Sequence, residues 1–156
     1  MQRFWLFAHL SGMALWLGSL FTMGILTSRA RATRDPGIIA FAYTVNHRVY
    51  RGLIVVVALV TTLAGVALMF VTGRLWFRPF PEHWLFQMQI VGLLALAATL
   101  FLLVPNSRAL SSLAARASEK GEPSPEMAAR MRRQAVAGSL VGLALIYLVL
   151  LGALRF

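Results

Sequence analysis

Four segments of the chain contain no Asp, Glu, Lys or Arg, and the charged residues gather between them. These segments cover residues 4–27, 52–72, 84–104 and 135–154, and each has 20 to 24 residues. A bilayer core of about 30 Å is crossed by roughly 20 apolar residues of α-helix, and a helix satisfies all its backbone hydrogen bonds within one segment. The pattern predicts an all-α integral membrane four-helix bundle, with residues 1–156 as a single four-span transmembrane domain.

The stretches between the spans predict short additional helices. Residues 38–50 mix apolar and polar side chains, which is typical of an interfacial helix or of the first turns of the next span. The third span is expected to end at Pro105. Residues 106–120 should then form an amphipathic helix with one apolar stripe and basic side chains that reach toward headgroups. Residues 124–126, Ser-Pro-Glu, are a helix start signal, so a helix should begin there and continue into the last span.

The net charge of +10 is distributed unevenly. Eleven Lys and Arg residues flank or lie in the first and third connections, against four on the other side of the predicted bundle. Basic residues concentrate on the cytoplasmic side of membrane proteins. We therefore expect both termini outside and a multi-pass protein of the bacterial inner (cytoplasmic) membrane. The basic connections should touch anionic lipid headgroups, and the charge does not indicate nucleic-acid binding.

The residue types present narrow the possible chemistry. The chain has no cysteine, which excludes disulfides, thiolate metal sites, iron–sulfur clusters and covalently attached haem. No carboxylate lies within a predicted span, which argues against a buried Asp or Glu proton relay. No pattern of residues predicts a catalytic group.

Histidine and methionine are the remaining candidates, and His9 is the strongest of them. It lies about 7–8 Å inside the first span at 1.5 Å per residue, and an ionisable side chain within a span is a functional candidate. The alternative is a neutral histidine that is hydrogen-bonded to a neighbouring helix. The same outer half of the predicted bundle contains further possible ligands: Met13, Met69, His83 and Met88.

Two cofactors use such side chains. Imidazole and thioether together ligate haem iron, and thioethers with imidazole hold Cu(I). Methionine also fills apolar gaps in ordinary cores, so simple packing is the competing interpretation. For haem b the candidate residues are His9, Met88, Met13, Gly12 and Gly92, with Arg74 and Arg78 for the propionates. For copper they are His9, Met88, His83 and Met69.

Small residues at helical spacing predict close helix contacts. Gly138 and Gly142 are four residues apart in the last span, and Ala14 and Gly18 in the first. Such pairs let membrane helices approach closely. They predict packing within the bundle or a homo-oligomer through Gly138 and Gly142.

Three stretches of sequence resemble a group of small membrane proteins. The run from His9 to Gly18 reads HLSGMALWLG, with a histidine ahead of Trp-x-Gly. Leu-Val-Pro precedes a basic helix at Pro105, and Arg132-Arg133 leads into a Gly-rich last span. These features resemble DUF2269 proteins, CopD-type copper-resistance proteins and HemJ-type protoporphyrinogen oxidases.

The resemblance implies specific roles. The HemJ type implies b-type haem held by the first-span histidine, here His9, and a lysine where this chain has Met88. That departure argues against protoporphyrinogen-oxidase activity, so no enzymatic function is assigned. The CopD type implies copper handling. Three hypotheses follow: a haem-b protein with an electron-transfer or accessory role, a copper-handling protein, and a cofactor-free accessory subunit of a larger membrane complex.

Overall fold

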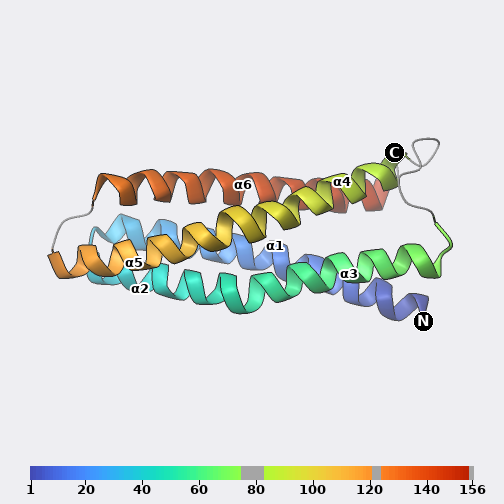
Figure 1. Cartoon of the computed structure of the whole chain (residues 1–156), viewed down its shortest axis with the longest axis horizontal. Helices are drawn as coiled ribbons and strands as arrows, with labels where there is room; N and C mark the ends of the chain where they lie inside the picture. The colour runs from blue at the N-terminus through green and yellow to red at the C-terminus, as the bar shows by residue number, and fades with distance from the viewer. Residues whose placement is uncertain (75–82, 121–123, 155–156) are drawn as a thin grey trace.

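The protein is an antiparallel bundle of four long helical rods (Figure 1). The computed structural model describes residues 1–74, 83–120 and 124–154, without the side chains of His83 and Lys120. Within these ranges no strand is present, and four helices are long and apolar enough to cross a membrane. This confirms the predicted all-α four-helix architecture. The elements, with η for a π-helical turn, are α1 (Gln2–Thr33), α2 (Pro36–Val49), η1 (Tyr50–Ile54), α3 (Val55–Val71), α4 (His83–Ala98), η2 (Thr99–Leu103), α5 (Val104–Lys120) and α6 (Pro125–Leu154).

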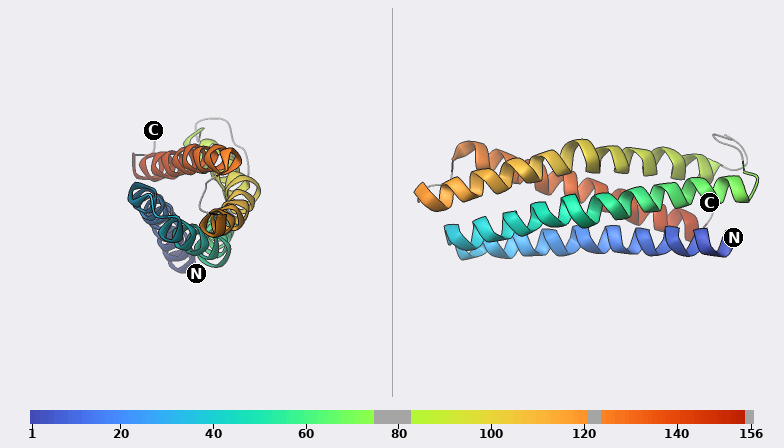
Figure 2. Two further views of the ribbon diagram at one scale, coloured as in Figure 1. Left: turned by 90° about the vertical axis from the view of Figure 1, so that its left-hand side faces the viewer. Right: turned by 60° about the horizontal axis from the view of Figure 1, so that its bottom comes forward.

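The bundle has two ends of different character. The start of α1 and the end of α6 lie at the same end as the last turn of α3 and the first turn of α4 (Figures 1 and 2). The α1–α2 turn lies at the opposite end, with the end of α5 and the start of α6. We call the two parts the terminal half (residues 2–16, 57–74, 83–97 and 143–154) and the basic half (17–56, 98–120 and 124–142). That the terminal half faces outward stays a prediction.

A two-residue turn joins α1 to α2, and local chemistry explains it. Arg34 adopts a left-handed conformation with φ 58°, which ends α1. Asp35 then caps α2, because its Oδ1 accepts the N–H groups of Gly37 at 2.7 Å and Ile38 at 3.2 Å. Pro36 occupies the first helical position, where its missing N–H has no cost.

α6 begins as the sequence predicts. Ser124 Oγ accepts the N–H of Met127 at 3.2 Å, and Pro125 is the first helical residue. Glu126 lies in the first turn and forms an ion pair with Arg130 at 2.9 Å. Because nothing interrupts the helix, the polar lead-in and the last span form one rod.

The expected helix end at Pro105 is wrong. α4, η2 and α5 form one continuous rod, with the π-helical turn directly before the proline. In a regular α-helix the proline ring would clash with the carbonyl group four residues earlier. In η2 the N–H of Val104 bonds to the Thr99 carbonyl, five residues back, and this wider turn accommodates Pro105. The helices predicted at 38–50 and 106–120 are thus present, but as extensions of the spans.

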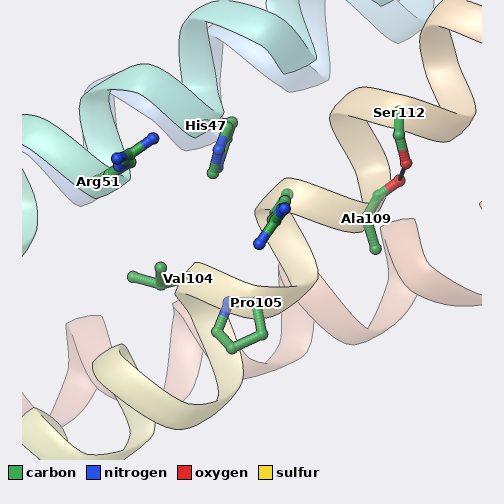
Figure 3. Close-up of a pocket in the computed structure, with 7 residues that line it drawn as sticks. His47, Arg51, Val104, Pro105, Ala109 and Ser112 are labelled. Carbon is green, nitrogen blue, oxygen red and sulfur yellow. Dashed lines mark hydrogen bonds between the residues drawn. The ribbon is translucent and has the colours of Figure 1, made fainter.

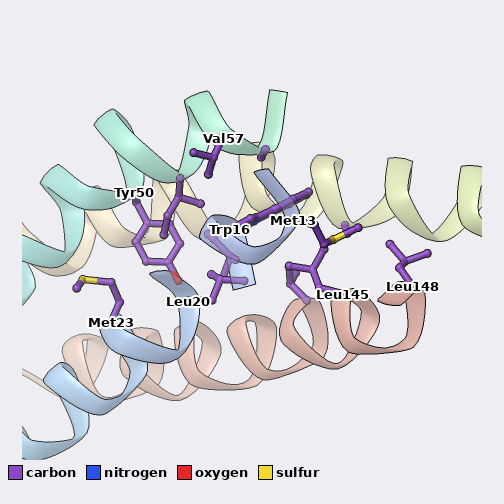
Figure 4. Packing of buried hydrophobic residues seen from close by; sticks show 13 residues of the cluster. Met13, Trp16, Leu20, Met23, Tyr50, Val57, Leu145 and Leu148 are labelled. Carbon is purple, nitrogen blue, oxygen red and sulfur yellow. The ribbon is translucent and has the colours of Figure 1, made fainter. Parts of the chain in front are cut away.

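One apolar core runs along the middle of the bundle (Figure 4). Trp16 of α1 is its largest member and is 1% exposed. It packs among the aliphatic side chains of the other rods, with Tyr50 and Met23 toward the basic half and Met13 toward the terminal half (Figure 4). In a bilayer such a ring holds the helices together by van der Waals packing, so this core fixes how the rods are rotated against one another.

A second, smaller cluster lies where the rods extend furthest into the basic half. Leu110 and Ala117 of α5 pack against Tyr43 of α2 and Met127 of α6. The apolar stripe predicted on residues 106–120 therefore exists, but it contacts neighbouring helices instead of lipid. A helix that is part of a continuous rod stays beside its neighbours, so its apolar face is buried against them.

The small-residue pairs do not mark the closest helix contacts within the chain. A Cβ built on Gly18 or Gly142 would meet nothing within 4 Å. The closest approach joins α1 to α3, where a Cβ on Gly12 would lie 2.2 Å from Thr61 Oγ1. A Cβ on Gly138 would meet the Tyr50 hydroxyl at 3.9 Å, and Gly142 is buried but would meet nothing within 4 Å, so this pair does not form the closest helix contact of the chain. Self-association through that face stays a prediction.

Candidate functional site

His9 joins the first helix to the backbone of α3. Its Nδ1 lies 2.8 Å from the Thr61 carbonyl oxygen. Since a carbonyl can only accept, Nδ1 carries the proton, and Nε2 keeps its lone pair in the neutral ring. The ring lies on Gly65, where a Cβ would come within 3.0 Å of His9 Cε1. The hydrogen bond from His9 to a neighbouring helix, which we considered as the alternative to ligand duty, is therefore present.

Two glycines make this contact possible. Gly65 of α3 receives the His9 ring, and Gly12 of α1 receives the Thr61 side chain. Thr61 Oγ1 donates to the Val57 carbonyl at 2.6 Å, so its hydroxyl is already satisfied. Each helix thus presents a side chain to a glycine of the other, and α1 and α3 interlock over one helical turn.

The predicted methionine ligands face other neighbours. Met88 of α4 packs against Gly152 of α6, whose added Cβ would be 3.5 Å from Met88 Cε. Met69 of α3 accepts a hydrogen bond from Gln89 Nε2 at 3.5 Å from its sulfur. Met13 is buried in the main core. None of these contacts brings a methionine sulfur to His9.

The remaining predicted residues are also separated. Gly92 faces Leu148 of α6 at 3.9 Å, and Arg74 stacks over the Trp84 ring at 5.2 Å. Arg78 and the His83 side chain lie outside the described part of the chain. Where side chains are described, no group of three or more His, Cys, Asp or Glu residues could hold a metal ion.

These contacts decide which cofactor geometry the residues fit. In the terminal half α1 packs between α3 and α6, so α4 lies diagonally across the bundle from α1. His9 is turned toward α3 and Met88 toward α6, and Thr61 fills the space beside Gly12. A haem held by both residues does not fit this arrangement. Haem binding through His9 alone and copper binding stay predictions.

The basic half contains a polar cluster that the sequence analysis missed. Asn106 Nδ2 of α5 donates to Gln134 Oε1 of α6 at 2.8 Å and to the Arg130 carbonyl at 3.0 Å. Asn46 of α2 is 3% exposed. The signal was present, because Asn106 and Gln134 lie within two residues of a charge-free segment, and Asn46 lies six residues before one, all at the same predicted end. Their side-chain directions depend on helix rotation, which the sequence does not fix.

Two cavities open in this half. One, of about 940 Å³, lies between α2 and α5, with His47, Arg51 and Arg108 among the residues around it (Figure 3). His47 Nδ1 lies 3.1 Å from Ser107 Oγ. The other, of about 700 Å³, is a groove between residues 20–31 of α1 and 131–146 of α6, with Asn46 and Tyr50 of the α2–α3 rod also lining it.

Comparison with known proteins identifies one family of which the model matches this sequence. A family model described as "Predicted integral membrane protein (DUF2269)" matches residues 4–156. No curated protein and no solved structure matches the chain.

Proposed function

The chain belongs to the DUF2269 family of predicted integral membrane proteins, and we propose that it is an accessory subunit of a larger complex in the bacterial inner membrane. In this proposal His9 works as a structural clamp. The observation that carries it is the 2.8 Å hydrogen bond from His9 Nδ1 to the Thr61 carbonyl, in a seam that is closed by Gly12 and Gly65.

The clamp explains why an imidazole is retained inside a span. A polar side chain in hydrocarbon is costly unless it has a partner, and the Thr61 carbonyl supplies one. Hydrogen bonds between membrane helices contribute roughly 0.6–2 kcal/mol. The ring also covers the backbone at Gly65. His9 therefore has a complete role in holding the α1–α3 pair without any bound metal.

The charge distribution supports the proposed location. Basic residues occupy the α1–α2 and α5–α6 connections and their flanks, as they do on the cytoplasmic side of inner-membrane proteins. Many large apolar side chains along the rods are exposed, among them Phe21, Leu63 and Leu143. In the membrane these surfaces face lipid or neighbouring subunits.

Affinity purification of the tagged full-length chain from its native membranes, in a mild detergent, tests the accessory role. We expect a colourless protein that elutes with a larger membrane protein at fixed stoichiometry. Elution alone, at every detergent concentration that keeps other complexes intact, would contradict the proposal. A cysteine pair across α1 and α3 in place of His9 and Gly65, tested for cross-linking, checks the seam in the same membranes.

Haem b binding is the second candidate, and one observation favours it. With Nδ1 held by a carbonyl, the Nε2 lone pair of His9 is free, and histidines that ligate metals commonly donate their other N–H in this way. Haem would supply one-electron chemistry. A reduced-minus-oxidised spectrum of the purified protein decides between the candidates. An α-band that disappears in His9→Ala and persists in His47→Ala would favour haem and overturn the structural role.

A further inference from the structure

The groove between α1 and α6 is hollow because its walls contain glycines. Gly24 of α1 and Gly142 of α6 line it, and a Cβ on either would meet nothing within 4 Å. Gly138 lies between them, and its nearest neighbour would be the Tyr50 hydroxyl at 3.9 Å. Apolar side chains such as Leu20 and Ile146 form the rest of this part of the wall. The part of the groove that these glycines line is therefore an apolar channel, and no side chain of the protein fills it.

Two buried polar atoms line the groove and lack partners among the described residues. Asn46 Oδ1 and Gln134 Nε2 form no hydrogen bond, although the side chains are only 3% and 9% exposed. Gln134 Oε1 already accepts a hydrogen bond from Asn106 Nδ2. The atom of Gln134 that lacks a partner is therefore Nε2, which donates. The Tyr50 hydroxyl interacts with the Gln134 side chain, but not at a distance and angle that satisfy Nε2.

These atoms define what a ligand must carry. Asn46 Oδ1 requires a donor such as a hydroxyl group, and Gln134 Nε2 requires an acceptor such as an ester or phosphate oxygen. An unpaired polar atom inside a membrane protein costs free energy, so a ligand that supplies a partner to one of these atoms binds favourably.

The rim of the groove is cationic. Arg29 and Arg31 of α1 are exposed and border it. Arg31 uses Nε to reach the Thr27 carbonyl at 3.3 Å, which leaves its terminal N–H groups for an anion. No carboxylate is among the residues that line the groove, so its charge favours a phosphate.

The position of the groove matches one leaflet of a bilayer. On α1 it extends from Leu20 to Arg31, about 17 Å at 1.5 Å per residue. Half of a 30 Å hydrocarbon core is about 15 Å. The glycine-lined part lies in charge-free sequence, and the part with arginines begins where the predicted span ends near Thr27. The groove is thus apolar toward the middle of the bundle and cationic toward its end, in the same order as the acyl chain and the headgroup of a phospholipid.

We propose that this groove binds one anionic phospholipid. An acyl chain lies along Gly24, Gly138 and Gly142. The phosphate faces Arg29 and Arg31 at the rim, and an ester oxygen, which lies deeper than the phosphate, accepts from Gln134 Nε2. This inference is independent of the accessory role, because a lipid-binding groove can serve the protein alone or in a complex.

Native mass spectrometry of the delipidated full-length protein tests the proposal with three probes. These are phosphatidylglycerol and phosphatidic acid, which are anionic, and phosphatidylcholine, which is neutral overall. We expect both anionic lipids to be retained more strongly than phosphatidylcholine. With an effect of about fivefold per arginine, phosphatidylglycerol should bind about 30-fold more tightly than phosphatidylcholine. Equal retention of all three lipids would overturn the proposal.

Matched variants locate the site. Gly142→Leu fills the groove and should lower phosphatidylglycerol affinity at least tenfold, whereas Gly18→Leu, on an exposed and equally open face of α1, should leave it unchanged. Arg29→Gln combined with Arg31→Gln should remove most of the preference for anionic lipid, while Arg116→Gln should not. Thermal unfolding of each variant checks that it is folded.

Two results would overturn the assignment in different ways. Undiminished binding of phosphatidylglycerol to folded Gly142→Leu would place the lipid elsewhere. A dimer that Gly142→Leu dissociates, with no lipid retained by the wild type, would assign the groove to a second copy of the chain. Neither result depends on the co-purification or the absorbance spectrum that test the accessory role. Failure of the lipid proposal can therefore be distinguished from failure of the accessory role.

Discussion

The two halves of the bundle use glycine in opposite ways. In the terminal half Gly12 and Gly65 each receive a side chain from the other helix, and α1 and α3 approach one another closely there. In the basic half Gly24 and Gly142 face open space. The comparison teaches that a small residue gives a close contact only where the partner helix presents a group to it. Where no group comes, the same residue creates a groove.

The polar side chains of the α1–α3 contact and of the groove also differ, in whether their polar atoms have hydrogen-bond partners. His9 and Thr61 satisfy their hydrogen-bonding groups toward the helix backbone, in a contact that closes the seam. Asn46 and Gln134 keep one unpaired atom each among the described residues. The α1–α3 contact is therefore closed by the chain's own side chains, whereas the groove between α1 and α6 is the site that we propose for a lipid.

A leucine at Gly12 is expected to have the largest effect on stability. Its Cβ would already overlap Thr61 Oγ1 at 2.2 Å, and overpacking of this kind costs about 3 kcal/mol or more when the backbones must separate. Gly142→Leu is the matched change in the other half and should cost less than about 1 kcal/mol. Thermal unfolding in detergent measures both. Equal losses would refute the contrast between seam and groove.

Removal of the amide of Asn106 is expected to have an intermediate effect. Asn106→Leu takes away the donor to Gln134 Oε1 and the Arg130 carbonyl, and buried acceptors left without a partner cost about 1–3 kcal/mol. Replacing Gln134 by leucine as well should recover part of the loss, because one orphaned group is then gone. A double-mutant cycle on the free energy of unfolding measures the coupling. Strict additivity would mean that the two amides do not interact.

His9→Leu should cost about 1 kcal/mol, the contribution of one hydrogen bond between membrane helices. The Thr61 carbonyl lies within a regular helix, so loss of the imidazole does not leave it wholly unpaired. His9→Gln keeps an amide donor and should lose less than His9→Leu. Unfolding midpoints of the three proteins test the order, and a loss in His9→Gln as large as in His9→Leu would argue against the hydrogen bond.

The smallest effect is expected at the exposed ion pair of α6. Glu126 and Arg130 are separated by one helical turn, and both side chains are substantially exposed. Pairs of this kind contribute about 0.3–0.5 kcal/mol in water. Glu126→Gln should therefore shift the unfolding midpoint only slightly, and less at high salt. A loss comparable with that of Asn106→Leu would show that the end of the basic half is packed more tightly than its contacts indicate.

Much of the architecture could be predicted from the sequence, and the reasons are local. Four charge-free runs of sufficient length specify four helices, because each helix satisfies its own backbone groups. Ser124 and Pro125 fixed the start of α6 in the same way. The prediction failed at Pro105, where the wide turn of η2 absorbs a residue that would otherwise end the helix. The presence of such a turn depends on packing along the whole rod.

The composition of the chain by itself determined that it is a four-helix membrane protein with one strongly basic end. Only the tertiary structure decided that His9 meets Thr61 instead of Met88, that Gly142 borders a groove, and that Asn46 and Gln134 approach the same space. Membrane insertion depends on the summed apolarity of a segment, which the sequence states directly. Side-chain pairing depends on the rotation and stagger of whole helices. The rotation and stagger of each helix follow from the packing of all four rods together, and the π-helical turns η1 and η2 change the rotation further.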